Sequence, residues 1–434
     1  MKKFFKETIT YILQKEAKLV LRKYNPKIVA VTGSVGKTST KDAIYTVLAS
    51  AYHVRKSEKS FNSELGIPLT ILGCDTGWGN PFIWLENIFH GLFLIVFTQK
   101  YPKWLILEVG ADRPGDIKKV TNWLHPDIVV ITRFGKVPVH VEFFNSREEV
   151  IREKSYLAHA LKQKGSLILN CDDEDVLALK EATKRKTFTY GFDGRADIVA
   201  SHYGVDYENY EGVTLPSGIS FKMNYGNNSL PTHIKGVLGI QQVYPLAAAF
   251  AVGYSEEINP VSMNDVLNNH ITPNGRMKLV SGIKKTMIID DGYNASPIAM
   301  EEAVLTLKSL NVSGKKIAVF GDMLEIGKYS TEAHKEIGML ASDSANILFT
   351  VGLRARSIAE GALDNGMDEK NIYQFDNSRE AGKFLEQMLG AGDVVLVKGS
   401  QGMRMERVVE EVMEHPEDKE KLLVRQEKEW QRKK

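Results

Sequence analysis

Short apolar runs alternate with amphipathic stretches along most of the chain. The runs are rich in Val, Ile and Leu, and each ends at a glycine or a polar residue. They lie at 28–31, 104–109, 128–132, 166–169, 287–289, 317–320, 347–351 and 394–397. Most are separated by stretches compatible with helices, such as 39–50. This alternation is typical of parallel α/β sheets.

The pattern changes at two places. Between 193 and 233, Gly, Asn, Tyr and Ser dominate, and polar and apolar residues alternate, as at 219–223. This texture predicts an antiparallel β insert. A turn cluster at 273–276 predicts a domain boundary. We therefore expect an α/β central domain with a mostly parallel sheet at 28–271, a C-terminal Rossmann-like domain at 272–414, and a charged, solvated tail at 415–434.

Two apolar segments raise the question of a membrane. Residues 1–27 carry eight Lys or Arg and two Glu, a balance of 8 − 2 = +6. Their apolar positions, spaced as in a helix, are Phe4, Phe5, Ile9, Ile12, Leu13 and Leu19. These positions predict a basic amphipathic helix. Three roles stay open for it: weak attachment to an acidic membrane surface, binding of a substrate diphosphate, or packing on the next domain. Residues 81–97 are shorter than the ~20 apolar residues of a membrane span, and they predict a buried or surface-packed helix.

The composition narrows the class of protein. The chain has 434 residues, of which 43% are hydrophobic and 25% charged, so it has ample material for separate cores. The formal charge of +2 gives no indication of nucleic-acid binding. The two cysteines, Cys74 and Cys171, have no metal-ligand spacing, and this scarcity indicates a reducing, cytoplasmic compartment.

A phosphate-binding loop follows the first apolar run. The sequence 32–38 reads TGSVGKT and leads into the helix-compatible stretch. Glycines let the backbone wrap around phosphate oxygens, a Lys supplies positive charge, and the hydroxyl after it suits Mg²⁺. Val31 stands where the full motif has its first glycine. The strand before the loop and the helix after it are the context that this motif requires.

Three further residues are ambiguous by themselves. Glu108 ends an apolar run, where it suits either Mg²⁺ or a salt bridge. His140 is as compatible with packing as with a metal, and Lys154 by itself reads as a solvated helix lysine.

Downstream, polar loops at 290–297, 321–327 and 398–402 follow three apolar runs directly. Loops at the carboxyl ends of strands are where open α/β sheets bind ligands.

The order of these motifs resembles the Mur ligase family of ATP-dependent amide-forming enzymes, over about 27–410. The matching stretches are 32–38 (TGSVGKT), 62–68 (NSELGIP), 108–111 (EVGA), 140–154, 165–173 (GSLILNCDD), 275–277, 290–297 (DDGYNASP), 321–327 (GDMLEIG) with His334, and 398–403 (KGSQGM). The last three favour the branch that adds D-alanyl-D-alanine to a UDP-muramoyl-tripeptide in peptidoglycan precursor synthesis.

The resemblance implies a role for each matching residue. In the family, ATP phosphorylates a carboxylate, and an amine attacks the acyl phosphate to form an amide. Lys37, His140 and Lys154 match catalytic residues, and Lys154 matches a carbamylated lysine. Thr38, Glu108, His140 and the Lys154 carbamate would hold two Mg²⁺ ions. The ATP-binding set is Thr32, Gly33, Ser34, Val35, Gly36, Lys37, Thr38, Ser39, Gln242, Arg276, Asp291 and Asn294. The substrate-binding set is Asn62, Ser63, Asp322, Lys398 and Ser400. A monomer is expected.

The chain departs from the family pattern at three places. Gln241 and Gln242 replace a His-Asn pair, and Asp112 replaces an Asn. About 27 residues precede the loop strand where this branch has a nucleotide-sugar-binding domain, so the usual cradle for the UDP end is not expected. Two alternatives stay open: a family ligase with another acceptor, folylpolyglutamate-like or a lipid-linked muropeptide, and a non-catalytic ATP-binding scaffold.

Overall fold

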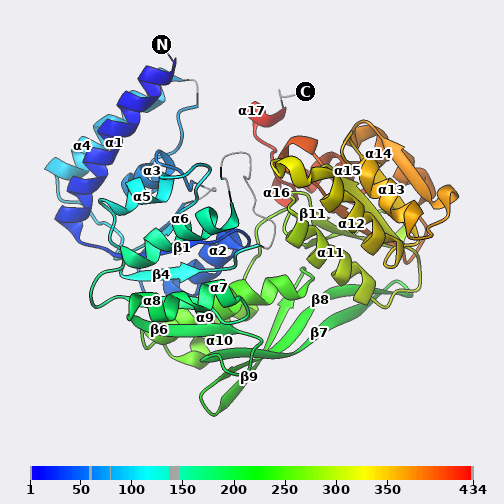
Figure 1. Ribbon diagram of the computed structural model, residues 1–434, viewed down its shortest axis with the longest axis horizontal. Helices are drawn as coiled ribbons and strands as arrows, with labels where there is room; N and C mark the ends of the chain where they lie inside the picture. Colours follow the sequence, from blue (N-terminus) through cyan, green and yellow to red (C-terminus); the bar gives the residue numbers. More distant parts are fainter. Residues whose placement is uncertain (1, 58–60, 79, 136–143, 145, 432–434) are drawn as a thin grey trace.

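The computed structural model describes residues 2–57, 61–78, 80–135, 144 and 146–431. Two units, each built on its own sheet, lie side by side (Figure 1). The first unit carries the N-terminal half of the chain, and the second carries the C-terminal part. The predicted α/β architecture, with a mostly parallel sheet in the first unit, is confirmed.

The sheet of the first unit has nine strands in the order β2-β3-β1-β4-β5-β6-β7-β8-β9. The strands from β2 to β7 in this order pair parallel with one another, whereas β8 pairs antiparallel with both β7 and β9. The predicted antiparallel segment thus extends the parallel sheet rather than forming a separate insert. The strands are β1 (Lys27–Thr32), β2 (Val54–Lys56), β3 (Trp104–Glu108), β4 (Ile128–Ile131), β5 (Ser166–Asn170), β6 (Lys186–Gly191), β7 (Ile198–Tyr210), β8 (Val213–Tyr225) and β9 (Asn228–Lys235).

Helices cover both faces of this sheet, and the strand β1 shows why. Val29 and Val31 pack into one core cluster together with helices α2 and α9, whereas Ile28 and Ala30 pack into another with α1, α3 and α6. Successive side chains of a strand point to opposite faces, so a strand buried on both sides is apolar throughout. The helices are α1 (Lys2–Tyr24), α2 (Lys37–Ala49), α3 (Gly66–Leu72), α4 (Pro81–Val96), α5 (Asp116–Thr121), α6 (Arg147–His159), α7 (Glu174–Leu177), α8 (Leu179–Thr183), α9 (Val243–Ser255) and α10 (Pro260–Asn268).

The second unit has a six-stranded sheet in the order β10-β11-β15-β12-β13-β14, parallel except for β10. Its strands are β10 (Lys278–Gly282), β11 (Thr286–Asp291), β12 (Lys316–Gly321), β13 (Ile347–Val351), β14 (Ile372–Phe375) and β15 (Val394–Lys398). Its helices are α11 (Pro297–Ser309), α12 (Ser330–Ser342), α13 (Arg356–Asp364), α14 (Ser378–Met388), α15 (Glu406–Val412), α16 (Lys419–Leu422) and α17 (Lys428–Gln431).

The N-terminal helix α1 packs on α3 and α4 at the edge of the first unit (Figure 1). Its buried stripe consists of Ile9, Leu13, Ala17 and Val20. Lys23 donates from Nζ to the carbonyls of Leu94, Ile95 and Phe97 at the end of α4, where a cation meets the negative end of the helix dipole. Of the three roles considered for this helix, packing accounts for its apolar stripe. No helix among the described residues has the length and apolar character of a membrane span.

The buried carboxyl of Glu16 in α1 lowers the free energy of unfolding. Its side chain is buried against α4, where Oε2 accepts no hydrogen bond from any residue in the described part of the chain. Burial raises the pKa of Glu16 to about 7. A carboxyl whose pKa is raised on folding costs stability when it ionises in the folded state, so this cost grows as the pH rises from about 4.5 to above 7.

We therefore expect Glu16→Gln to raise the melting temperature at pH 8, by more than it does at pH 5. Thermal unfolding of both proteins at the two pH values measures this difference. The exposed Glu7 on the same helix supplies the control Glu7→Gln, for which no pH-dependent gain is expected. A gain for Glu16→Gln that is the same at pH 5 and pH 8 contradicts the interpretation.

The tail predicted to be solvated at 415–434 is exposed at 415–418, 420 and 421, but part of it packs on the second unit. Leu423 and Arg425 are buried. The Arg425 guanidinium donates to Glu406 Oε2 at 2.9 Å and to the carbonyl of Gly292 at 3.0 Å. The Glu406 carboxylate and the Gly292 carbonyl therefore hold this segment on the second unit. Charge density alone did not distinguish a docked cationic residue from a solvated one.

Candidate active site

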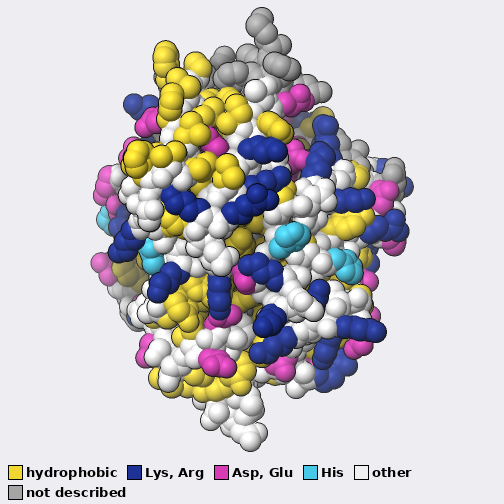
Figure 2. Space-filling view, turned by 90° about the vertical axis from the view of Figure 1, so that its left-hand side faces the viewer, with side chains coloured by type: hydrophobic (Ala, Val, Ile, Leu, Met, Phe, Trp, Pro, Cys, Tyr) yellow, Lys and Arg dark blue, Asp and Glu magenta, His cyan; other side chains and the backbone are white. Residues whose placement is uncertain are grey.

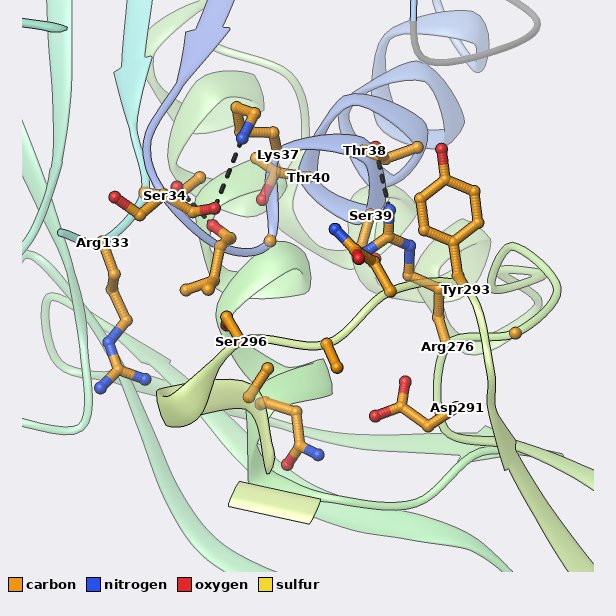
Figure 3. A pocket seen from close by; sticks show the side chains of 18 of the residues that line it. Ser34, Lys37, Thr38, Ser39, Thr40, Arg133, Arg276, Asp291, Tyr293 and Ser296 are labelled. Atoms are coloured by element: carbon orange, nitrogen blue, oxygen red, sulfur yellow. Dashed lines mark hydrogen bonds between the residues drawn. The ribbon is translucent and has the colours of Figure 1, made fainter. Parts of the chain in front are cut away.

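A cavity of about 820 Å³ lies between the two units. The loop after β1, the end of β3 and the start of α9 line it from the first unit; the loops after β11, β12 and β15 line it from the second. In the first sheet β1 lies between β3 and β4, and the chain changes direction across the sheet there. A point of this kind is where open parallel sheets bind ligands. Figure 3 shows the cavity from close by.

Two glycines shape the loop after β1. Gly33 has φ 145°, and a Cβ there would lie 1.9 Å from Thr132 Oγ1. Gly36 has φ 79° and directly precedes α2. Both conformations favour glycine, and they bring the backbone of 34–38 and the amino end of α2 to the cavity. A loop of this form presents N–H groups and the positive helix end to an anion.

Lys37 lies over this loop. Its Nζ donates to the carbonyls of Gly33 at 3.0 Å and Ser34 at 3.4 Å (Figure 3). Burial lowers the pKa of Lys37; the Glu108 carboxylate opposes that shift, and Arg276 adds to it. An anionic ligand in the cavity would relieve this burial cost, since it would pair with the ammonium.

Thr38, Glu108 and Asn62 form one polar cluster. The Thr38 hydroxyl donates to Glu108 Oε2 at 3.0 Å, and Asn62 Nδ2 donates to Glu108 Oε1 at 3.3 Å. Arg276, from the second unit, reaches Thr38 Oγ1 at 3.3 Å and lies over the Tyr293 ring (Figure 3). The Glu108 side chain is buried. A hydroxyl and a buried carboxylate at 3.0 Å are oxygen donors that fit Mg²⁺.

Lys154 on α6 is buried, not solvated as its sequence neighbours suggested. Its Nζ donates to the Gly33 carbonyl at 3.1 Å, so it lies directly behind the phosphate loop. Burial, with a contribution from the charge of Lys37, lowers the pKa of Lys154 to about 7. His140 falls outside the described residues. Among those described, no group of three His, Cys, Asp or Glu side chains comes together as a metal site.

The second unit contributes a buried ion pair to the cavity. Lys398 Nζ contacts Asp291 Oδ2 at 2.6 Å and the Asn294 carbonyl at 3.0 Å. Burial raises the pKa of Asp291, whereas Lys398 opposes this shift. Ser400 Oγ accepts from the Leu324 N–H at 2.9 Å, which joins the loops after β12 and β15.

Several predicted residues lie beside the cavity or hold its loops. Asp322 does not line the cavity; its Oδ1 accepts from the Ala355 N–H at 2.7 Å. Ser63 Oγ accepts from the Gly66 N–H at the start of α3 at 3.3 Å, and Thr32 is buried at the end of β1. Gln242 lines the cavity and donates to the Arg276 carbonyl at 3.1 Å.

Several residues that line the cavity were not predicted. Arg133 follows β4 and forms an ion pair with Glu302 of α11, which joins the two units. The Arg133 guanidinium also lies over the Tyr244 ring. Trp430 reaches the cavity from the tail. Only Arg133 was accessible to sequence reasoning, since it stands at the carboxyl end of a predicted strand.

Removing one partner of this ion pair is expected to destabilise the protein more than removing both. Arg133→Met leaves the mostly buried Glu302 carboxylate unpaired, at a cost of about 3 kcal/mol. The double variant Arg133→Met/Glu302→Gln is expected to recover part of that loss. Urea unfolding of the wild type, both single variants and the double variant measures the coupling. Strictly additive effects would show that the pair does not join the units.

A phosphate loop facing the polar loops of a second α/β unit defines a nucleotide-binding enzyme of two units. The sequence profile of the Mur ligase middle domain matches residues 31–83 and 85–253, and that of the Mur ligase glutamate ligase domain matches 275–401. The chain belongs to the Mur ligase family.

Individual relatives agree with this assignment. The UDP-N-acetylmuramoyl-tripeptide–D-alanyl-D-alanine ligase of Bacillus subtilis is 31% identical over 411 residues, which cover 94% of this chain and 80% of that one. The MurF ligase of Thermotoga maritima in complex with ADP is 28% identical with a TM-score of 0.73, covering 93% of this chain and 83% of that one. MurF of Acinetobacter baumannii, 22% identical, shares the fold with a TM-score of 0.74, over 92% and 79% of the two chains.

Proposed function

We propose that this chain is an ATP-dependent, ADP-forming ligase that joins D-alanyl-D-alanine to UDP-N-acetylmuramoyl-tripeptide in peptidoglycan precursor synthesis. The observation that carries the proposal is that the phosphate loop, Asp291, Lys398 and Ser400 line the same cavity. The names of the B. subtilis relative and the T. maritima structure support the substrate and the nucleotide.

The reaction has two steps. The tripeptide carboxylate attacks the γ-phosphorus of ATP, which gives an acyl phosphate and ADP. The amine of D-alanyl-D-alanine then attacks the acyl carbon, phosphate leaves, and the amine loses a proton. Both steps bring anions together, so a site that neutralises phosphate charge lowers their barriers.

Residues 32–39 form the proposed nucleotide-binding site. The loop N–H groups and the Lys37 ammonium bind phosphate oxygens, with Thr32, Gly33 and Gly36 shaping the backbone. Arg276, Asp291 and Asn294 close on the nucleotide from the second unit. Gln242 offers an amide to the base. Asn62, Ser63, Asp322, Lys398 and Ser400 form the proposed substrate side, where Ser63 and Asp322 act by holding loops rather than by direct contact.

Two Mg²⁺ ions are part of the proposal. Thr38 and Glu108 would hold the first, and His140 and carbamylated Lys154 would hold the second. Bound Mg²⁺ supplies positive charge that offsets the charge of the phosphoryl group. Lys154 is suited to carbamylation because CO₂ reacts with a neutral amine, and a pKa of about 7 leaves about half of the amine neutral at pH 7.

We also propose that the predicted divisions at 28–271 and 272–414 separate the two functional domains. The two sheets and the two family profiles support these boundaries. Cys74 and Cys171 are free cysteines, which supports a reducing, cytoplasmic location. The monomeric state stays a prediction.

Phosphate release by the purified chain tests the choice of acceptor. With ATP and Mg²⁺, UDP-N-acetylmuramoyl-tripeptide plus D-alanyl-D-alanine is expected to stimulate release most strongly. Greater stimulation by a folate with glutamate, or by a lipid-linked muropeptide, would assign the chain to another acceptor. ATP hydrolysis that no carboxylate and amine pair stimulates would favour a scaffold without ligase chemistry.

A further inference from the structure

Helix α4 exposes an unbroken apolar face at the edge of the first unit. Trp84, Asn87, Gly91 and Leu94, spaced three or four residues apart, form its buried stripe. The opposite side of the helix, within an arc of about 100° at 3.6 residues per turn, carries only apolar side chains. These are Phe82, Leu85, Phe89, Leu92, Phe93 and Val96, and the first is 79% exposed. Glu86 and His90 stand beside this arc rather than within it.

Positive charge lies next to this face. Helix α1 packs beside α4, and its outward side carries Lys15, Lys18 and Arg22 at the spacing of a helical stripe that begins at Tyr11. Lys18 contacts the Trp123 ring, and Lys15 lies over the Tyr11 ring. Figure 2, which views the side of the molecule where α1 and α4 lie, shows hydrophobic side chains gathered over one part and Lys and Arg side chains beside them.

We propose that the exposed face of α4, together with the basic stripe of α1, docks the protein on an anionic phospholipid surface. Apolar side chains of an interfacial helix enter the boundary between headgroups and acyl chains, and neighbouring lysines meet lipid phosphates. The two contributions lie on neighbouring helices of one face, which a lipid surface contacts at the same time. The face is the convex side of a helix rather than a groove. Glu86 and His90 border it on α4, and the positive charge that matches an acidic plane comes from Lys15, Lys18 and Arg22 of α1.

The apolar contact with the membrane surface thus comes from α4 and not from α1, where the sequence suggested it. Of the apolar positions predicted on α1, Ile9 and Leu13 are buried in the protein and cannot enter a membrane. Lys15, Lys18 and Arg22 keep the attraction to an acidic surface that was one of the predicted roles, whereas Lys23 binds the end of α4. The cavity between the units does not include α4, so docking and ligation can be measured separately.

Co-sedimentation of the full chain with vesicles tests the proposal. We expect binding to vesicles of phosphatidylglycerol and phosphatidylcholine, at least tenfold weaker binding to phosphatidylcholine alone, and a loss of binding at high salt. Phe89→Ser/Phe93→Ser is expected to weaken binding at least tenfold. Lys15→Ser/Arg22→Ser is expected to abolish the preference for phosphatidylglycerol.

Ile271→Ser/Leu353→Ser is the matched control, because these apolar residues are 81% and 74% exposed and lie outside α4. This control is expected to bind vesicles like the wild type, and all three variants are expected to retain phosphate release. Equal binding by the wild type and Phe89→Ser/Phe93→Ser would overturn the proposal. The proposal would also be overturned if the wild type does not bind anionic vesicles but forms a dimer, and if Phe89→Ser/Phe93→Ser is a monomer. A second copy of the chain would then cover the face.

Discussion

Lys37→Ala is expected to lower ATP turnover by about 10³-fold, close to complete loss. Lys37 lies over the phosphate loop and contacts its carbonyls, so the variant loses positive charge at the place where the loop faces the cavity. A group aimed at charge that develops in the transition state typically contributes 10²- to 10³-fold. Initial rates of phosphate release at saturating ATP measure the loss.

The fold of Lys37→Ala is expected to survive, because the side chain fills no core volume. An unchanged melting temperature checks this point. Lys118→Ala, which removes an exposed lysine from the same unit, is the matched control and is expected to turn over ATP normally. Near-normal turnover by Lys37→Ala would refute the assignment of the phosphate loop.

Lys154→Ala is expected to be nearly inactive, with a loss of about 10²-fold or more. The side chain is buried behind the phosphate loop, where its pKa of about 7 supplies a neutral amine for CO₂. If the working species is the carbamate, short carboxylates such as formate or acetate restore part of the activity by placing an anion in the vacated space. Phosphate release with and without added carboxylate measures the rescue.

The pH dependence of carbamylation follows from the same lowered pKa. Below pH 7 most of the Lys154 amine is protonated and cannot react with CO₂, so reactivation of CO₂-depleted protein by bicarbonate is expected to slow as the pH falls from 8 to 6. Lys164→Ala, an exposed lysine nearby in the sequence, is the control and is expected to keep full activity. Unchanged activity of Lys154→Ala would mean that the buried amine has no part in the reaction.

Local patterns predicted the architecture well because its strands are buried on both faces. A run such as that around Val29 must be apolar throughout, and its end in a glycine-rich loop marks the phosphate site. The same reasoning could not distinguish an insert from an extension of the sheet at β7 to β9, since pairing partners are not written in a strand's own sequence.

The candidate site was most predictable at the ends of strands. Glu108, Asp291 and Lys398 are the last residues of β3, β11 and β15, and all three line the cavity. Lys154 was not predictable from its charged helix neighbours, because its burial depends on where α6 packs. The pair of Arg133 and Glu302 depends on how the two units meet, and the docking of Arg425 depends on a carboxylate within a distant helix.

Mass spectrometry of the reaction products tests the central claim most directly. The purified chain is incubated with ATP, Mg²⁺, UDP-N-acetylmuramoyl-tripeptide and D-alanyl-D-alanine. We predict a product whose mass is the sum of the last two substrates less one water, formed together with one ADP and one phosphate, and absent when ATP is omitted. ATP consumed without that product, by protein that binds nucleotide normally, would contradict the account.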